Sequence, residues 1–416
     1  MPPLLVLFPP LFILYPVSYV LMLYRTLFPL RPAGTRVRVG GKLVKGYLVG
    51  TADEATEDAT NLERLGDNNL PFCEDVVVWK SIAIFSSDPT RDVYNPFAAE
   101  GDPTKAKNGR LVALHLNEHG ATAYDIVHDF TGELHPLGVG VHRTQPLLAV
   151  ANLAATPSVE VFRLTIVNSK LRAEHLHTLT HPSLTTPNAV VPLSEDSVLV
   201  TNSFRFPAKS SKLLNTLEIF LAIPGGSVLC LSAKDKTVCD KVARGIALAN
   251  GLAISEDGSV LAVAGCFTSN IHIYDVYPPL LSDGHDLSMA GRLRFRESIP
   301  AGFMVDNLRF VLTDTHHIFL ACGHPSGLDF TACAKSHGTY LSGTRAVSVR
   351  VPKQGKRSWW NALFTRVDDR VTILFEDDGR MLGSGATACS TDNGSDIIVT
   401  GLFDRRGPIR SGNIDL

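Results

Sequence analysis

Two stretches of the chain share one pattern, NAVVPLSEDSVLVTN at 188–202 and NGLAISEDGSVLAVAG at 250–265. Each predicts a β-strand, an acidic turn and a second, more apolar strand. Similar units are DNLRFVLTDTHHIFLACG at 306–323 and ATACSTDNGSDIIVTG at 386–401. The first three units start 62 residues (188 to 250) and then 56 residues (250 to 306) apart. Such intervals suit propeller blades of four strands, somewhat longer than the roughly 40–50 residues of common repeats.

Short β-branched runs separated by turn residues recur from about residue 73 onward, for example at 76–85, 159–166 and 397–400. We therefore expect an all-β fold, a six-bladed β-propeller over residues 73–416, because closure of the ring removes most exposed sheet edges. An array of β-sandwiches is the alternative. One short helix is expected over 209–221, where leucines follow helical spacing. It either packs against the body or covers one face of the propeller.

The composition limits the class of protein. The chain has 416 residues, 45% of them hydrophobic, with a net charge of −2. A large core is therefore possible, and nucleic acid is excluded as the main partner because phosphate binding needs a basic excess or patch. The seven cysteines form no C-x-x-C pair, which excludes a zinc ribbon and a dense disulfide scaffold.

The first 24 residues carry no charged side chain, and 4–24 read LLVLFPPLFILYPVSYVLMLY. This length predicts a membrane-anchoring helix within 1–30, with 31–72 as a connector. A cleaved signal peptide and a buried strand are the alternatives. The basic residues that follow favour a cytoplasmic orientation, whereas the glycosylation sequon 393–395 favours the lumen. We expect a membrane-associated glycoprotein facing the secretory lumen or the extracellular side, with its orientation open.

Polar residues recur where the repeated units begin. Asn188, Asn250 and the pair Asp306-Asn307 hold this position, and the pair Glu74-Asp75 precedes the first strand of the body. The inner strands of a propeller converge on a central channel, so these oxygens could meet and bind Ca²⁺, which takes about six to eight oxygen ligands. Two carboxylates, Glu74 and Asp306, would balance its charge. The alternative is that each Asn is a turn or bulge residue.

The sequence resembles the serum paraoxonase/arylesterase family of calcium-dependent six-bladed propellers over roughly residues 73–416. The resemblance rests on short pieces in family order. They are Glu74-Asp75, Phe85-Ser86-Ser87, Tyr94-Asn95-Pro96, Gly109-Arg110-Leu111, Leu116-Asn117-Glu118, His135-Pro136-Leu137-Gly138, 158–162, Pro187-Asn188, 249–258, 271–274, Val305-Asp306-Asn307 and 323–327.

The resemblance implies a catalytic calcium and suggests a role for several residues. The ion would be held by the set Glu74, Asn188, Asn250, Asp306 and Asn307. His324 matches a family histidine near the site. The helix at 209–221 matches a segment that covers the active-site mouth and can lie against membrane or lipoprotein. A retained hydrophobic N-terminus is also expected, because the family keeps it as a lipid-binding anchor.

The chain departs from the family at three places. Leu137 and Leu153 stand where the family has a proposed histidine dyad, with His135 and His142 nearby in sequence. Ala189 replaces the aspartate expected for a second, structural calcium, which puts that ion in doubt although Asp75 remains. The C-terminus lacks the family's cysteine, so Cys73 is expected to be a free, buried thiol.

These observations predict a Ca²⁺-dependent hydrolase of lactones or aryl esters, with a small-molecule substrate. The metal would polarise the carbonyl, and Asp306 is the candidate base, with His324 and His135 as further candidate catalytic residues. The gluconolactonase and senescence-marker-protein group lacks the dyad, so loss of the two histidines does not imply an inactive protein. The alternatives are a non-catalytic propeller that acts as a binding or scaffold protein, and a metal-independent lyase or synthase of the strictosidine-synthase type.

Overall fold

The fold comes from a computed structural model. It describes Tyr24 and residues 32–49, 60–66, 69–117, 122–235, 239–280, 289, 291–311, 316–353, 368–392, 394–414 and 416. Apart from Tyr24, the predicted anchor lies outside the described residues, and so does Asn393 of the sequon. Among the helices within the described ranges, none is long and apolar enough to cross a bilayer.

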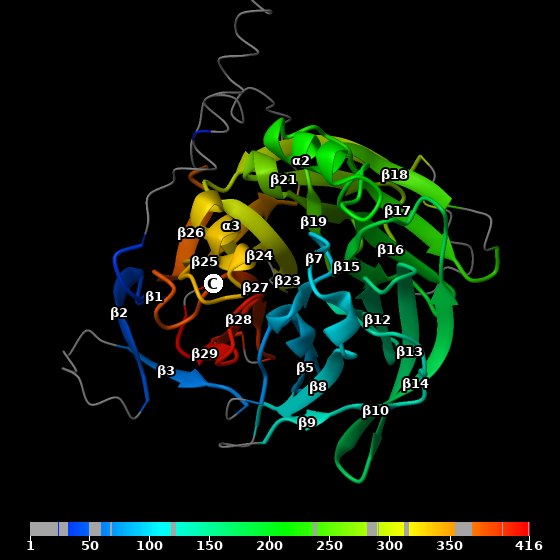
Figure 1. The fold of residues 1–416 in the computed structure, drawn as a ribbon. Coiled ribbons are helices and arrows are strands. Elements are labelled where there is room, and N and C mark those ends of the chain that lie inside the picture. The colour runs from blue at the N-terminus through cyan, green and yellow to red at the C-terminus, as the bar shows by residue number, and fades with distance from the viewer. Residues whose placement is uncertain are drawn as a thin grey trace, which may run out of the picture.

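The described chain is mostly β, and its sheets are arranged like the blades of a propeller (Figure 1). Four sheets of four or five strands stand separately. They are β4 (Cys73–Trp79), β5 (Ile82–Ser87), β8 (Arg110–His115) and β9 (Tyr124–Asp125); β11 (Pro136–Val141), β12 (Leu147–Asn152), β13 (Ser158–Val167) and β14 (Lys170–Leu179), with β10 (Val127–His128) parallel to β14; β15 (Pro187–Pro192), β16 (Ser197–Asn202), β17 (Gly226–Ser232) and β18 (Cys239–Ile246); and β19 (Ala249–Ile254), β20 (Val260–Gly265), β21 (Asn270–Val276) and β22 (Leu293–Pro300).

A fifth sheet has ten strands and includes three from the N-terminal part of the chain. In sheet order they are β23 (Met304–Val311), β24 (His316–His324), β25 (Thr344–Pro352), β26 (Val371–Asp377), β1 (Arg36–Val39), β2 (Lys42–Leu48), β3 (Thr60–Arg64), β29 (Ile409–Ser411), β28 (Ile397–Gly401) and β27 (Gly385–Ser390). The segment 31–72, which we predicted as a connector, therefore supplies three strands. Its short, basic, partly exposed strands resemble a linker in composition, yet Val37 and Leu62 are fully buried in the core.

The repeated strand–turn–strand units are confirmed, and their acidic residues have a local role. NGLAISEDGSVLAVAG forms β19, a turn and β20. In that turn Asp257 Oδ1 accepts hydrogen bonds from the hydroxyls of Ser255 and Ser259 and from the Ser259 amide. The turn carboxylate thus accepts hydrogen bonds from groups that have no backbone acceptor within a tight turn.

The first strands of the sheets contact one another in a closed cycle, β4–β11–β15–β19–β23–β27–β4. Every one of these strands has a register shift against its partner at an equivalent place. The shifts lie at 73–75, 136–139, 187–190, 249–252, 305–308 and 385–388. A β-bulge re-aims side chains, and the polar residues predicted to converge lie within these bulges.

Glycine permits the close approach of neighbouring inner strands. A Cβ atom on Gly251 would lie 2.5 Å from the Leu308 nitrogen, and one on Gly138 would lie 2.3 Å from the Asn188 carbonyl oxygen. Neither contact is possible for a real side chain, so these two glycines set the spacing on which the site depends.

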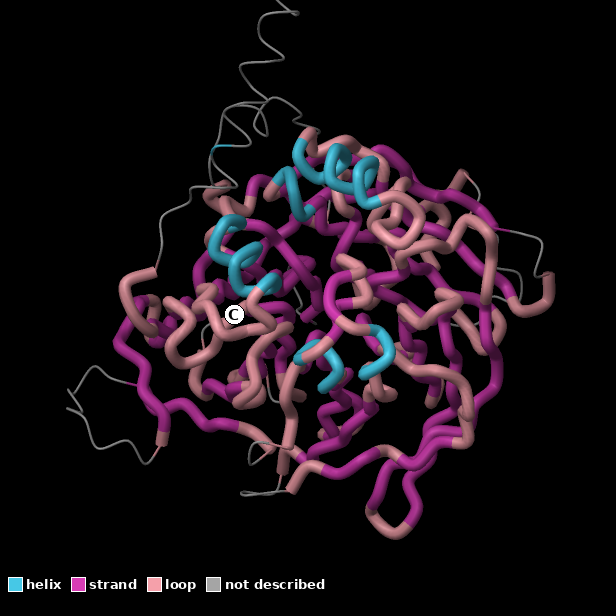
Figure 2. The backbone as a smooth tube through the Cα atoms, in the orientation of Figure 1, coloured by secondary structure: helices cyan, strands magenta, loops and turns pink. Residues whose placement is uncertain are grey.

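From residue 32 onward, the helical segments of the described chain are few and short (Figure 2). They are α2 (Lys212–Phe220), α3 (Gly327–Lys335) and the short helices at Pro89–Asp92, Pro103–Lys105 and Cys266–Thr268, while β6 (Tyr94–Asn95) and β7 (Glu100–Gly101) form a small ribbon. Helix α2 confirms the helix predicted over 209–221 and begins at the N-cap Ser211.

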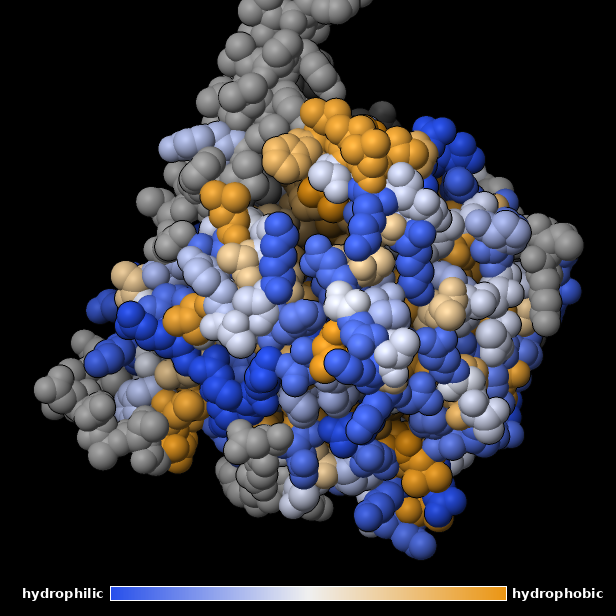
Figure 3. Space-filling model, in the orientation of Figure 1, coloured by the Kyte–Doolittle hydropathy of each residue, from blue (hydrophilic) through white to orange (hydrophobic). Residues whose placement is uncertain are grey.

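Helix α2 turns its polar side inward. Glu218 is 1% exposed and accepts hydrogen bonds from the backbone amides of Arg205 and Phe206, at 2.9 and 2.8 Å. Leu213 and Phe220 are 71% and 73% exposed. Figure 3 shows the resulting hydrophobic surface over this helix. The leucines at helical spacing therefore cover the outer face and are not packing residues.

Candidate functional site

A cavity of about 380 Å³ opens beside α2 and α3 and brings together residues that are distant in sequence. Glu74, Asn188, Asn250 and Asp306 line it, one from each of the inner strands β4, β15, β19 and β23. Asn307, the fifth predicted ligand, is fully buried next to Asp306 and donates from its amide to Glu74 Oε1 at 3.0 Å. The structure therefore gathers the predicted set from four bulged strands.

Oxygen atoms of these side chains are buried without a hydrogen-bond donor in the described part of the chain. They are Glu74 Oε2, Asn188 Oδ1, Asn250 Oδ1 and Asn307 Oδ1. Buried polar atoms are nearly always paired, and four unpaired acceptors at one place require an explanation. A hard cation such as Ca²⁺, which takes oxygen ligands, fits this donor set.

Two carboxylates carry the charge of the site. Burial, with the nearby charges of Asp75 and Asp306, raises the pKa of Glu74 well above its usual value. Asp306 is 4% exposed and accepts a hydrogen bond from the Asn250 amide on Oδ1. Negative charge that is buried at such cost needs a compensating cation.

His324 stands beside Asp306, at the end of β24. Its Nε2 lies 3.3 Å from Asp306 Oδ2, and its ring stacks on Phe330 with centroids 3.6 Å apart. The other ring nitrogen, Nδ1, is buried without a partner among the described residues. Asp306 thus holds one nitrogen of the ring and leaves the second available for proton transfer.

The site is not a cluster of the usual transition-metal ligands. Among the described residues, no three His, Cys, Asp or Glu side chains are arranged to hold a metal ion. Neutral asparagine oxygens make up the larger part of the set, a chemistry that suits calcium rather than zinc.

His135, a candidate catalytic residue, lies outside the cavity lining, as do Leu153, at one position of the replaced dyad, and His142, near it in sequence. His135 is buried outside the lining of the cavity, with Nδ1 3.0 Å from Asp88 and Nε2 3.2 Å from Glu133. His142 lies at a different pocket, where its Nδ1 accepts two backbone amides and burial lowers its pKa. Of the leucines that replace the dyad, Leu137 lines the cavity, whereas Leu153 is buried outside its lining. Strand β11 brings Leu137 to the cavity wall, whereas His135 precedes this strand and His142 follows it. Leu153 lies just after β12, so closeness in sequence does not place these side chains at the site.

The cavity wall contains residues that sequence reasoning missed. Its aromatic lining comes from loops and helices. The phenylalanine rings are Phe97, Phe204, Phe220, Phe267, Phe330 and Phe403. Arg91 lies in a short helix, is 2% exposed and donates hydrogen bonds to the carbonyls of Phe72 and Pro136. Its positive charge lowers the pKa of Glu74 and so opposes the rise that burial causes. Tyr94-Asn95-Pro96, one of the short pieces that carry the family resemblance, directly precedes Phe97 and could have pointed to this part of the wall.

Comparison with known proteins identifies the family. Residues 102–332, more than half of the chain, match the arylesterase family. The chain is 28% identical to serum paraoxonase/arylesterase 2 of Gallus gallus over 286 residues, which cover 68% of this chain and 70% of the relative. It is 28% identical to serum paraoxonase/lactonase 3 of Oryctolagus cuniculus over 334 residues, covering 79% and 82%.

The chain belongs to the arylesterase family, so the resemblance predicted from short sequence pieces is confirmed. Among solved structures, a gluconolactonase from Xanthomonas campestris is similar, with a TM-score of 0.48 and 15% identity, covering 93% of this chain and 100% of that one.

Proposed function

We propose that this protein is a Ca²⁺-dependent hydrolase of lactones or aryl esters. The observation that carries the proposal is a group of four unpaired, buried oxygens, three from asparagines and one from Glu74, beside the Asp306 carboxylate at an accessible cavity. Membership of the arylesterase family and the lactonase names of its relatives support the reaction class.

Glu74, Asn188, Asn250, Asp306 and Asn307 would hold the calcium ion. When bound, the ion supplies a Lewis acid that polarises a carbonyl oxygen. Asp306 and His324 form the candidate proton-accepting pair for the attacking water, because Nε2 and Oδ2 are within 3.3 Å and His324 Nδ1 is unpaired. Stacking on Phe330 fixes the plane of the imidazole.

The wall of the cavity indicates the substrate class. Aromatic rings and Leu137 surround the polar base, so an apolar acyl chain or an aryl leaving group would be buried on binding. Phe97 and Phe204 lie with ring centroids 5.2 Å apart and offer edges and faces to a planar group. Aryl esters and lactones with hydrophobic substituents are therefore preferred over small hydrophilic ones.

We also propose that the ten-stranded sheet represents two blades, which gives the six-bladed propeller. Strands β23–β26 form one antiparallel run, and β27, β28, β29 and β3 form another. The hairpin of β1 and β2 joins their outer edges. On this interpretation the N-terminal strand β3 completes the last blade and closes the ring.

Membrane association through the N-terminal segment, on the luminal or extracellular side, stays part of the proposal. The exposed leucines of α2 would add a second contact at the mouth of the cavity. Replacing Leu213 with Asp should weaken binding of the full-length protein to phosphatidylcholine vesicles by about tenfold, since burial of a leucine contributes roughly 1.5–3 kcal/mol. Ile166→Asp, 47% exposed on β13, is the control with unchanged binding. Equal loss in both variants would contradict a role for α2.

The function is tested by assaying a panel of lactones and aryl esters with and without calcium. Turnover should require calcium, be removed by EDTA and be restored by added Ca²⁺. Asp306→Asn should abolish both calcium binding, measured by calorimetry, and turnover. Turnover that resists EDTA would overturn the proposal, and calcium binding without turnover of any substrate would favour the non-catalytic binding protein.

A further inference from the structure

Asp75 follows Glu74 in β4 but faces a different environment. It is 1% exposed, and both of its oxygens are occupied. Oδ2 accepts the Val139 amide at 2.8 Å, while Oδ1 accepts the Val76 amide at 2.9 Å and the Thr387 hydroxyl at 2.7 Å. The charge of this carboxylate is met by the guanidinium of Arg309, which also donates to Oδ1.

Arg309 also donates three hydrogen bonds from its guanidinium to backbone carbonyls. Nε donates to Val76 O, Nη1 to Leu308 O and Nη2 to Val139 O, each at 2.9 Å. Its side chain is 11% exposed. One cationic group thus contacts four oxygens from the three inner strands β4, β11 and β23.

A structural calcium site in the channel would also consist of a cation bound by a buried aspartate and backbone carbonyls. The residues present do not fit that ion. Asp75 has no oxygen left without a donor, a positive charge already lies beside it, and Ala189 stands where the family pattern expects a second carboxylate. A divalent ion there would meet guanidinium repulsion with only one carboxylate to offset it.

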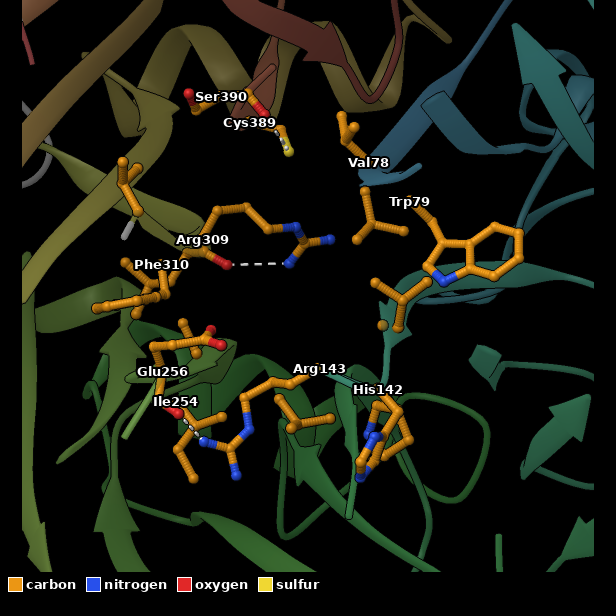
Figure 4. Close-up of a pocket in the computed structure, with 18 of the residues that line it drawn as sticks. Val78, Trp79, His142, Arg143, Ile254, Glu256, Arg309, Phe310, Cys389 and Ser390 are labelled. Carbon is orange, nitrogen blue, oxygen red and sulfur yellow. Dashed lines mark hydrogen bonds between the residues drawn. The ribbon is translucent and has the colours of Figure 1, made fainter. Parts of the chain in front are cut away.

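We propose that the Arg309 guanidinium replaces a second calcium ion, so that the chain binds calcium only at the Glu74–Asp306 cavity. The inner strands are then held together by a cation that is covalently part of the protein. Figure 4 shows Arg309 extending across a second pocket, of about 570 Å³, toward Val78 of β4. The C-terminal parts of the inner strands line this pocket. The guanidinium therefore lies within the channel and connects β23 to β4 and β11, which are not its neighbours in the ring.

Calcium stoichiometry tests the proposal directly. Calorimetry and native mass spectrometry of the full chain should give one Ca²⁺ per protein. Two bound ions would overturn the inference. Absence of calcium binding would agree with the role of Arg309 but overturn the proposed function, so the two failures can be told apart.

Substitutions test the same point by stability. Arg309→Met should lower the Tm by roughly 10 °C, because the buried Asp75 carboxylate loses its counter-ion. Arg143→Met is the matched control. Arg143 lines the same pocket, and its partners within the described residues are the carbonyls of Ser255, Glu256 and Leu280. Its loss should lower the Tm much less, because no buried carboxylate is left without its cation.

A double variant tests whether the ion site can be rebuilt. Arg309→Met with Ala189→Asp places two carboxylates in the channel without the guanidinium. The calcium stoichiometry should rise from one to two, and calcium should restore part of the Tm lost in Arg309→Met. Equal Tm losses for Arg309→Met and Arg143→Met, with stoichiometry unchanged in the double variant, would contradict the proposal.

Discussion

Glu74 and Asp75 are neighbours in one bulged strand, and their carboxylates meet different surroundings. Glu74 has one oxygen bonded to Asn307 and one without a donor among the described residues. Asp75 accepts hydrogen bonds on both oxygens and is paired with Arg309. On the proposed function the first carboxylate receives a cation from solution, whereas the second has a cation supplied by the chain.

The difference lies in the donors that the neighbouring strands present. Facing Glu74 are asparagine side chains, which leave their oxygens unpaired. Facing Asp75 are a guanidinium, a hydroxyl and two backbone amides. A buried acceptor that is left unpaired costs about 1–3 kcal/mol, a cost that a cation bound at Glu74 would offset. Pairing therefore separates a ligand site from a structural one even between adjacent residues.

The largest effect is expected from Glu74→Gln. The shape of the side chain is kept, but the calcium site loses one of its two charges. Turnover of lactones or aryl esters should fall by about 10³-fold or more, since metal polarisation contributes several kcal/mol. Calcium affinity, measured by calorimetry, should fall with it.

Glu256→Gln is the matched control, because Glu256 is exposed at the opposite pocket. It should retain wild-type turnover and calcium affinity. Full activity in Glu74→Gln would contradict the contrast between Glu74 and Asp75, since Glu74 would then not be a ligand of a catalytic calcium ion.

Asp75→Asn should mainly affect stability. It leaves the Arg309 guanidinium buried beside a neutral amide, and breaking a buried ion pair in this way costs about 3–5 kcal/mol. Denaturant unfolding measures this loss. Calcium stoichiometry of the folded fraction should stay at one, and a variant that unfolds like the wild type would show that the pair contributes little.

The sequence was a better guide to the inner strands than to the rest of the site. The repeated units and the Asn and Asp-Asn starts predicted the strands and their convergence, because strand alternation and bulges act locally. The partner of Asp75 could not be predicted, since Arg309 is 234 residues away in sequence and only the ring brings it near. The outward orientation of the α2 leucines could not be predicted either. It follows from hydrogen bonds between Glu218 and the backbone amides of a loop, and a helical pattern does not reveal these bonds.

The pH dependence of the calcium-free protein sharpens the contrast. Burial and the neighbouring carboxylates raise the pKa of Glu74 in the folded state, so the protonated form is favoured by folding. The stabilisation is present below the ordinary pKa and is lost as the pH rises through the raised value. In EDTA, the Tm should therefore decrease between pH 5 and pH 8.

Glu74→Gln should flatten that decrease and raise the Tm of the calcium-free protein at pH 8, although the same change removes calcium binding. The expected gain in unfolding free energy is about 1–3 kcal/mol. Scanning calorimetry in EDTA measures it, with Glu256→Gln following the wild-type curve. A steeper pH dependence in Glu74→Gln would contradict the assignment of the effect to this carboxyl.

The smallest effect concerns Cys73, which precedes the two carboxylates in β4. It is a free thiol that is 1% exposed, as predicted, and burial raises its pKa to about 12. At pH 8 the thiol is therefore neutral, and the thiolate is the reactive form. Cys73→Ala should leave the number of reagent-accessible thiols in the native protein unchanged and lower it by one after denaturation. The half-buried Cys239 is the matched control, since Cys239→Ala should lower the native count. A fall in the native count for Cys73→Ala would mean that the strand opens at the position where both carboxylates are held, and would weaken the contrast between them.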